Sequence, residues 1–115
     1  MKILKCGTLI TPDSIQKDKY LCIENGKITA IKDSINPSQE KSVIDVSDKI
    51  VGPGLVDIHC HGALNTDFSD GDPEGITKAS EYHLQMGTTT LLGTIGSCMP
   101  DEMTKAMDTI RALTR

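Results

Sequence analysis

The order of predicted elements in the second half of the sequence constrains the fold most. The nearly continuous apolar run of residues 50–58 predicts a strand buried on both faces, and residues 88–94 predict another. A helix is expected between them, because Asp72 can cap its start and Pro73 suits its first position. A further helix is expected to begin at Pro100. Strands that alternate with helices in this way form a parallel sheet built from βαβ units.

Two strand-helix units are too few to close a sheet. A TIM (β/α)8 barrel takes roughly 250 residues, whereas this sequence has 115. Each of the two strands would keep an unpaired edge, and open hydrophobic edges are sites of aggregation. We therefore expect residues 53–115 to be the truncated start of such a barrel, and the chain to be the beginning of a larger protein.

Residues 1–52 show a different pattern, that of short strands joined by polar turns. Asn25-Gly26 lies between two alternating runs, which predicts a hairpin, and residues 42–46 predict a further strand. We assign this region to a small antiparallel β domain, a portion of a β-sandwich. The predicted fold class is thus α/β, with the β domain preceding the first two βα units of the barrel.

Composition argues against several functional classes. The net charge is -4, and lysine and arginine do not cluster, so nucleic acid is not an expected partner. Lys2 and Lys5 interrupt the apolar N-terminus, which argues against a secretory signal. No apolar run is long enough to span a membrane, so no membrane partner is expected. The four cysteines are widely spaced, which favours reduced thiols and a cytoplasmic protein.

Two histidines follow the first buried strand, in the segment GLVDIHCHG of residues 54–62. Residues two apart on a strand share a face, so His59 and His61 are expected to project together while Cys60 points away. Two such imidazoles form a bidentate clamp for one divalent ion. Asp57 is expected one pleat deeper on the same face, where its carboxylate can accept a hydrogen bond from a ring N–H and orient the ligand.

Other polar residues have simpler interpretations. A bare His-x-His also occurs by chance, and the strand end and the polar loop after it are what favour a metal here. His83 falls on the apolar face of the expected helix, which favours packing over ligation. Asp67, Asp70 and Asp72 lack the terminal glutamate of a calcium loop and fit a solvated loop. Three methionines are expected to fill the core: Met99, Met103 and Met107.

The chain resembles the opening of the amidohydrolase superfamily in three segments: IENGKITAI, VIDVSDKIVGPGLVDIHCHG and GTTTLLGT. That opening is a small β domain followed by a first barrel strand that carries Asp-x-His-x-His. Within the superfamily, the segment TDFSDGDPEGITKASEYHLQMGTTTLLGT is most similar to the N-acetylglucosamine-6-phosphate deacetylases. The resemblance covers almost the whole chain.

The resemblance implies a metal-dependent hydrolase of amino-sugar metabolism. Its substrate would be a small amino-sugar phosphate, whose N-acetyl group is hydrolysed to give glucosamine 6-phosphate and acetate. His59 and His61 match the metal pair of the family, and the expected cofactor is a divalent ion, Zn²⁺. The other ligands and the catalytic aspartate come from later strands in the family, so this chain is expected to contain no catalytic residue and to be inactive alone. A homo-oligomer is expected, a dimer for the full-length family.

Two alternatives remain open. The first is another amidohydrolase, either a dihydroorotase-like cyclic amidase or a deaminase. The segment Gly62-Ala63-Leu64-Asn65 lacks the arginine that dihydroorotase-like members place just after the histidine pair, which weakens this alternative. The second is a non-catalytic remnant that self-associates.

Overall fold

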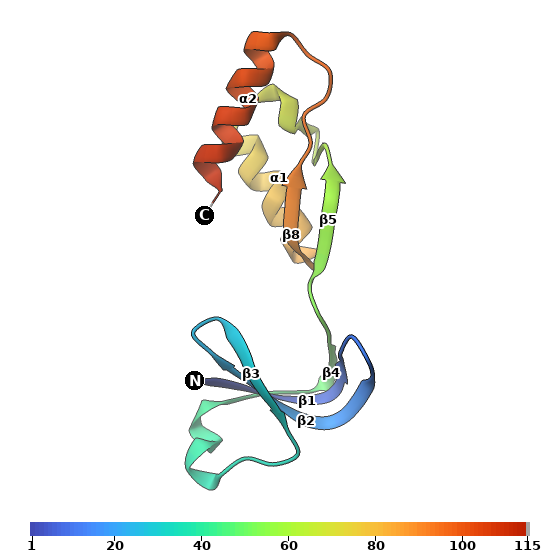
Figure 1. The fold of residues 1–115 in the computed structure, drawn as a ribbon, viewed down its shortest axis with the longest axis vertical. Coiled ribbons are helices and arrows are strands. Elements are labelled where there is room, and N and C mark those ends of the chain that lie inside the picture. The colour runs from blue at the N-terminus through green and yellow to red at the C-terminus, as the bar shows by residue number, and fades with distance from the viewer. Residues whose placement is uncertain (115) are drawn as a thin grey trace. The chain divides into compact units, whose positions relative to one another are not determined.

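A computed structural model describes residues 1–114 of the chain, which divide into two units (Figure 1). The first unit comprises Met1–Pro53, and the second begins at Gly54. The first is a β-sheet, and the second consists of β/α units. Among the described residues, no helix is long and apolar enough to cross a membrane.

The first unit is a four-stranded sheet with the strand order β3-β2-β1-β4. Asn25 and Gly26 form the predicted hairpin turn between β2 and β3, and both residues have positive φ angles, 50° and 73°. A 3-10 helix, η1, precedes β4. The bounds of these elements are β1 Lys2–Ile10, β2 Ile15–Glu24, β3 Lys27–Lys32, η1 Pro37–Ser42 and β4 Val43–Val51.

The sheet is mixed, which corrects the prediction of an antiparallel sheet. β1 pairs with β2 in antiparallel fashion, but it pairs with β4 in parallel, with Ile3 opposite Val43. The segment that follows β3, including η1, returns the chain to the opposite edge of the sheet, where β4 runs alongside β1. Residue alternation predicts which face a side chain occupies but not the direction of the neighbouring strand, so the sequence pattern could not reveal this pairing.

One face of this sheet carries a small aliphatic core. Cys6, Leu9 and Leu21 are buried there, and Val46 and Val51 of β4 pack against them. Burial raises the pKa of the Cys6 thiol, because the apolar surroundings disfavour the thiolate. Across the β1–β4 pair, Lys5 Nζ lies 3.2 Å from the Asp45 carboxylate.

The second unit has the predicted order of strand, helix, strand and helix. β5 and β8 pair in parallel, and α1 connects them. A short hairpin of β6 and β7, followed by the 3-10 helix η2, lies in the loop between β5 and α1; the sequence pattern did not predict these pieces. The bounds are β5 Leu55–Cys60, β6 Gly62–Ala63, β7 Thr66–Asp67, η2 Phe68–Asp70, α1 Pro73–Gln85, β8 Thr88–Gly93 and α2 Pro100–Leu113.

The predicted start of α1 is confirmed. The Asp72 carboxylate accepts hydrogen bonds from the backbone N–H groups of Glu74 and Gly75, at 3.2 and 3.0 Å, and Pro73 takes the first helical position. The helix ends before Gly87, whose φ of 97° lets the chain turn into β8.

The core of the second unit lies between the strands and the helices. Four buried side chains form it, and Leu91 and Ile110 pack against them; the four are Cys60, Phe68, Ile76 and Ala79. Met99, Met103 and Met107 are exposed, contrary to the predicted core role. The buried residue of α2 is the small Ala106, so α2 packs against the rest of the unit through a face that does not include these methionines.

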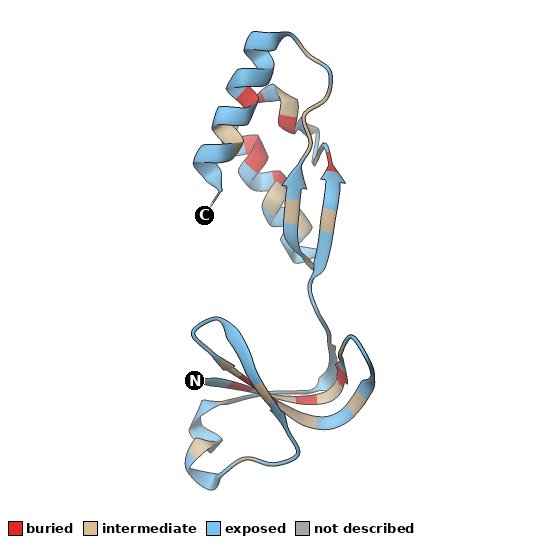
Figure 2. Ribbon diagram, in the orientation of Figure 1, coloured by how far each residue is buried: buried red, intermediate tan, exposed pale blue. Residues whose placement is uncertain are grey.

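The strands of the second unit are not buried on both faces as predicted. Figure 2 shows exposed residues along much of β5 and β8. Among them are four apolar side chains: Leu55, Val56, Ile58 and Leu92. The apolar composition of these strands therefore leaves an uncovered hydrophobic surface within the described residues.

Candidate metal centre

The histidine pair converges at the end of β5. His59 belongs to the strand and His61 follows it, and their Nε2 atoms lie 3.2 Å apart. The rings are tilted by 50° with centroids 5.2 Å apart, and both side chains are exposed. The structure therefore brings together the two residues that the sequence analysis selected as metal ligands.

The spacing of these nitrogens fits two ligands of one ion. Imidazole nitrogens bind zinc at about 2.0–2.1 Å in tetrahedral geometry, which places two such nitrogens about 3.4 Å apart. The observed 3.2 Å separation is close to that value. The donor set and its exposure suit a zinc-class ion that takes further ligands.

Asp57 lies elsewhere than predicted. Its Oδ1 accepts a hydrogen bond from the backbone N–H of His59 at 3.0 Å, whereas a bond to a ring N–H was expected. The reason is an irregularity in β5: Asp57 pairs with Leu91 and Cys60 pairs with Gly93, so three steps along β5 match two along β8. This bulge places Asp57 and Cys60 on the same face of the strand. Asp57 thus supports the backbone of His59 and not its ring.

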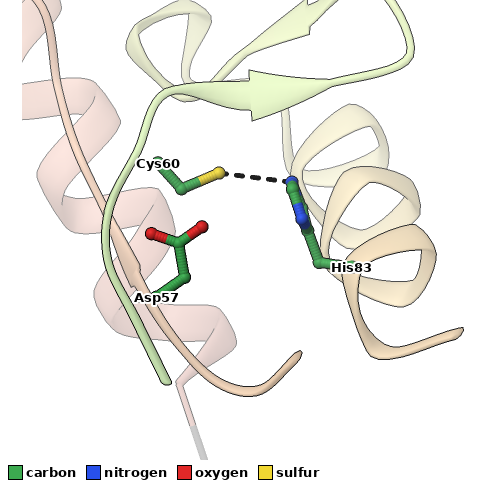
Figure 3. Close-up of side chains that lie close together, drawn as sticks. All are labelled: Asp57, Cys60 and His83. Atoms are coloured by element: carbon green, nitrogen blue, oxygen red, sulfur yellow. Dashed lines mark hydrogen bonds between the residues drawn. The ribbon is translucent and has the colours of Figure 1, made fainter. Parts of the chain in front are cut away.

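Cys60 and His83 contact each other, which the sequence did not predict. Cys60 Sγ lies 3.2 Å from His83 Nε2 (Figure 3). The same nitrogen lies 3.3 Å from the carbonyl oxygen of Gly62. His83 is half-buried on the inner face of α1, as expected, yet its polar edge meets the thiol. The direction of the Cys60 side chain depends on how β5 pairs with β8, so the sequence pattern alone does not predict this contact.

The loop after the pair is held by backbone hydrogen bonds and by one glycine. The N–H of Phe68 donates to the carbonyl of His61 at 2.7 Å. Gly62 has a φ of 140°, and a Cβ there would overlap the carbonyl oxygen of Thr66, so only glycine permits the close β6–β7 pairing. The ring of Phe68 is fully buried beneath this loop.

Asp67 and Asp70 form a capping box at η2, which the sequence analysis did not predict, whereas Asp72 caps α1 as predicted. Asp67 accepts from the backbone N–H of Ser69 at 2.7 Å, and Ser69 Oγ accepts from the N–H of Gly96 at 2.8 Å. Hydrogen bonds from Ser69 lower the pKa of the Asp67 carboxyl, and His61 adds a smaller electrostatic effect in the same direction. An open hollow beside His61 is lined by Asn65 and Asp70, among other loop residues.

No protein-family model matches the chain. Individual relatives do: it is 37% identical over 90 residues to a dihydroorotase of Pediococcus pentosaceus, an alignment that covers 78% of this chain and 20% of the relative. It is 28% identical over 94 residues to the N-acetylglucosamine-6-phosphate deacetylase of Bacillus subtilis, covering 80% of this chain and 24% of the relative. The fold matches a crystal structure of the Mycobacterium smegmatis deacetylase with a TM-score of 0.81 and 22% identity, over 98% of this chain and 32% of that one.

The chain matches the N-terminal region of the amidohydrolase superfamily. It spans about a fifth of the length of the curated amidohydrolases that it matches. The likeness to the solved deacetylase shows the fold of this amidohydrolase region, a β-sheet followed by β/α units. Both kinds of relative, the dihydroorotase and the deacetylase, occur among its sequence matches, so similarity alone does not select a substrate.

Proposed function

We propose that this chain is the N-terminal part of a cytoplasmic, zinc-dependent deacetylase that acts on N-acetylglucosamine 6-phosphate. The observation that carries the proposal is the convergence of His59 and His61, with Nε2 atoms 3.2 Å apart, at the C-terminal end of β5. Active sites of (β/α)8 barrels are built at the C-terminal ends of the strands. The segment of residues 66–94, which resembles the deacetylases, supports the choice of substrate. A mutant of the mycobacterial deacetylase, whose fold this chain shares, was solved in complex with this sugar phosphate.

In this proposal the two imidazoles hold the ion through their Nε2 atoms. A bound zinc ion supplies Lewis acidity toward the acetyl carbonyl and a water of lowered pKa. Asp57 accepts a hydrogen bond from the backbone of His59, and the Phe68 N–H donates one to the backbone of His61. The backbone that carries each imidazole is therefore held in place. Two imidazoles leave a tetrahedral ion two ligands short. The resemblance to the amidohydrolases implies that the remaining ligands and the group that protonates the departing amine come from later strands of the family's barrel.

A second candidate is hydrolysis of a cyclic amide, as in the dihydroorotases. The 37% identity to the Pediococcus enzyme over 90 residues favours it. Against it stands the segment Gly62-Ala63-Leu64-Asn65, which lacks the arginine expected to hold a substrate carboxylate. Both candidates use the same histidine pair, so the substrate distinguishes them and the metal does not.

The test uses the complete open reading frame that carries this chain. The purified product is assayed for bound zinc and for hydrolysis of N-acetylglucosamine 6-phosphate and of dihydroorotate, alongside His59→Ala/His61→Ala and the exposed control Glu81→Gln. We expect deacetylation in the wild type and in the control, and in the double variant the loss of activity and of the zinc that the histidine pair holds. Turnover of dihydroorotate alone would establish the second candidate. Wild-type zinc content and rate in the double variant would overturn both.

A further inference from the structure

Three side chains with metal-binding atoms meet on the helix side of β5: Asp57, Cys60 and His83 (Figure 3). One ligand atom from each, a carboxylate oxygen, a thiol sulfur and an imidazole nitrogen, lies within 4.8 Å of the other two. We propose that these residues form a second metal site, separate from the histidine pair, which takes a divalent ion of the zinc class. Metal binding at this second site does not depend on the proposed deacetylase activity.

Two elements hold the cluster in place. The bulge in β5 turns Asp57 and Cys60 toward α1, and His83 comes from the inner face of that helix. The backbone of Cys60 is fixed on both sides, since its N–H donates to Thr94 Oγ1 at 3.1 Å and its carbonyl accepts from the Thr94 N–H at 2.8 Å. Cys60 also belongs to the buried core, whereas Asp57 and His83 are half-buried. The site is therefore rigid on the thiol side and reachable from solvent on the other.

A fourth donor completes the arrangement. The carbonyl oxygen of Gly62 lies 3.3 Å from His83 Nε2 and 3.6 Å from Cys60 Sγ, and the sulfur and nitrogen are 3.2 Å apart. Zinc bonds of about 2.3 Å to sulfur and about 2.1 Å to nitrogen or oxygen give tetrahedral edges of about 3.4–3.6 Å. Three donor atoms thus already stand near the spacing of one tetrahedral face. A carboxylate oxygen of Asp57 lies within 4.8 Å of both the thiol sulfur and an imidazole nitrogen, close enough to join them at one ion.

The donor types select the class of ion. A thiolate, an imidazole and a carboxylate together suit zinc and its cobalt substitute, whereas calcium and magnesium prefer oxygen ligands alone. Coordination replaces the thiol hydrogen, which leaves to solvent as a proton. An ion bound here joins β5 to α1, so it stabilises the second unit.

The same residue types also occur in cysteine nucleophile triads, but the geometry here is different. In a triad the carboxylate hydrogen-bonds the imidazole nitrogen that faces away from the thiol and orients the ring. Among the hydrogen bonds of residues 1–114, none joins Asp57 to His83. The buried thiol is also poorly placed to meet a substrate. The convergence of the three donor atoms on one point therefore favours coordination of a metal ion over nucleophilic catalysis by the thiol.

Cobalt is the probe that tests this site. The whole 115-residue chain is stripped with a chelator and titrated with Co²⁺ while the thiolate-to-cobalt charge-transfer band is followed in the near ultraviolet. We expect the band in the wild type and in His59→Ala/His61→Ala, because the histidine pair contains no sulfur. Cys60→Ser is expected to lose the band. His83→Gln and Asp57→Asn are each expected to weaken Co²⁺ binding at least about tenfold, which is the scale of losing one well-placed partner.

Cys98→Ser is the matched control, since Cys98 is a half-buried thiol of the same unit that lies outside the cluster. Its band and affinity are expected to equal those of the wild type. Circular dichroism verifies that each variant is folded, and if Cys60→Ser unfolds, His83→Gln and Asp57→Asn decide the outcome. A folded wild type without the band overturns the proposal and leaves a hydrogen-bonded cluster only. A band lost in Cys98→Ser, or unchanged by both the His83 and the Asp57 substitution, overturns it equally.

Discussion

The backbone N–H of Phe68 donates to the carbonyl oxygen of His61 at 2.7 Å, so a residue with a fully buried side chain anchors one of the two histidines proposed to bind metal. The chain reaches this contact through the β6–β7 hairpin, in which Gly62 pairs with Asp67 and Ala63 with Thr66. The loop after β5 is thus held to the second unit by defined backbone hydrogen bonds. Its geometry determines where His61 stands.

Replacing Gly62 with alanine tests this role of the loop. The added Cβ would overlap the Thr66 carbonyl, and the φ of 140° is strained for any residue with a side chain. We expect a loss of about 1–3 kcal/mol in the free energy of unfolding, measured by urea denaturation. Gly87→Ala is the control, because its φ of 97° is also strained but no atom lies within 4 Å of the added Cβ. An equal loss in both variants would show that the hairpin contact contributes nothing.

The N-cap of α1 has a measurable effect on stability. Asp72→Ala removes the acceptor of two backbone N–H groups, so we expect the free energy of unfolding to fall by about 1 kcal/mol. Asp72→Asn keeps an acceptor oxygen and should lose less. Denaturant unfolding followed by circular dichroism compares the two variants. Asp72→Ala with wild-type stability would contradict the capping role.

The first unit should depend on pH through Asp45. Hydrogen bonds from Ser47, together with the Lys5 ammonium 3.2 Å away, lower the pKa of the Asp45 carboxyl from 3.8 to about 2. A lowered pKa in the folded state stabilises the fold above the unfolded value, and this contribution disappears as the pH falls from about 4 toward 2. The difference in melting temperature between the wild type and Asp45→Asn should therefore be largest above pH 4 and vanish near pH 2. Asp13→Asn serves as control, and a difference that grows on acidification would refute the assignment.

The sequence predicted those parts of the fold that local chemistry determines. The N-cap at Asp72, the Asn25-Gly26 turn and the order of the β/α units follow from capping, turn geometry and hydrophobic patterning. Strand alternation also placed His59 beside His61. The position of Asp57 could not be predicted, because it depends on a bulge that arises only when β5 pairs with β8. The parallel pairing of β4 with β1 likewise depends on the partner strand and not on the residues of β4 alone.

The uncovered apolar side chains of β5 and β8 predict self-association of this chain. Ile58 is 73% exposed, and burying one such side chain in a contact contributes about 1.5–3 kcal/mol. We expect Ile58→Lys to weaken self-association at least about tenfold in sedimentation velocity experiments. Ile28→Lys is the control, since Ile28 is similarly exposed, at 66%, but lies in the first unit. A wild type that stays monomeric at every concentration would contradict the prediction.

Histidine NMR during a zinc titration tests the central claim, that His59 and His61 hold one divalent ion. The ring ¹⁵N resonances report each imidazole nitrogen separately, so the pair can be followed independently of His83 and its neighbours. The account predicts that the Nε2 signals of His59 and His61 shift together with the same zinc dependence, and that His59→Ala removes the response of His61. Independent shifts of the two rings, or no shift of either in the folded chain, would contradict it.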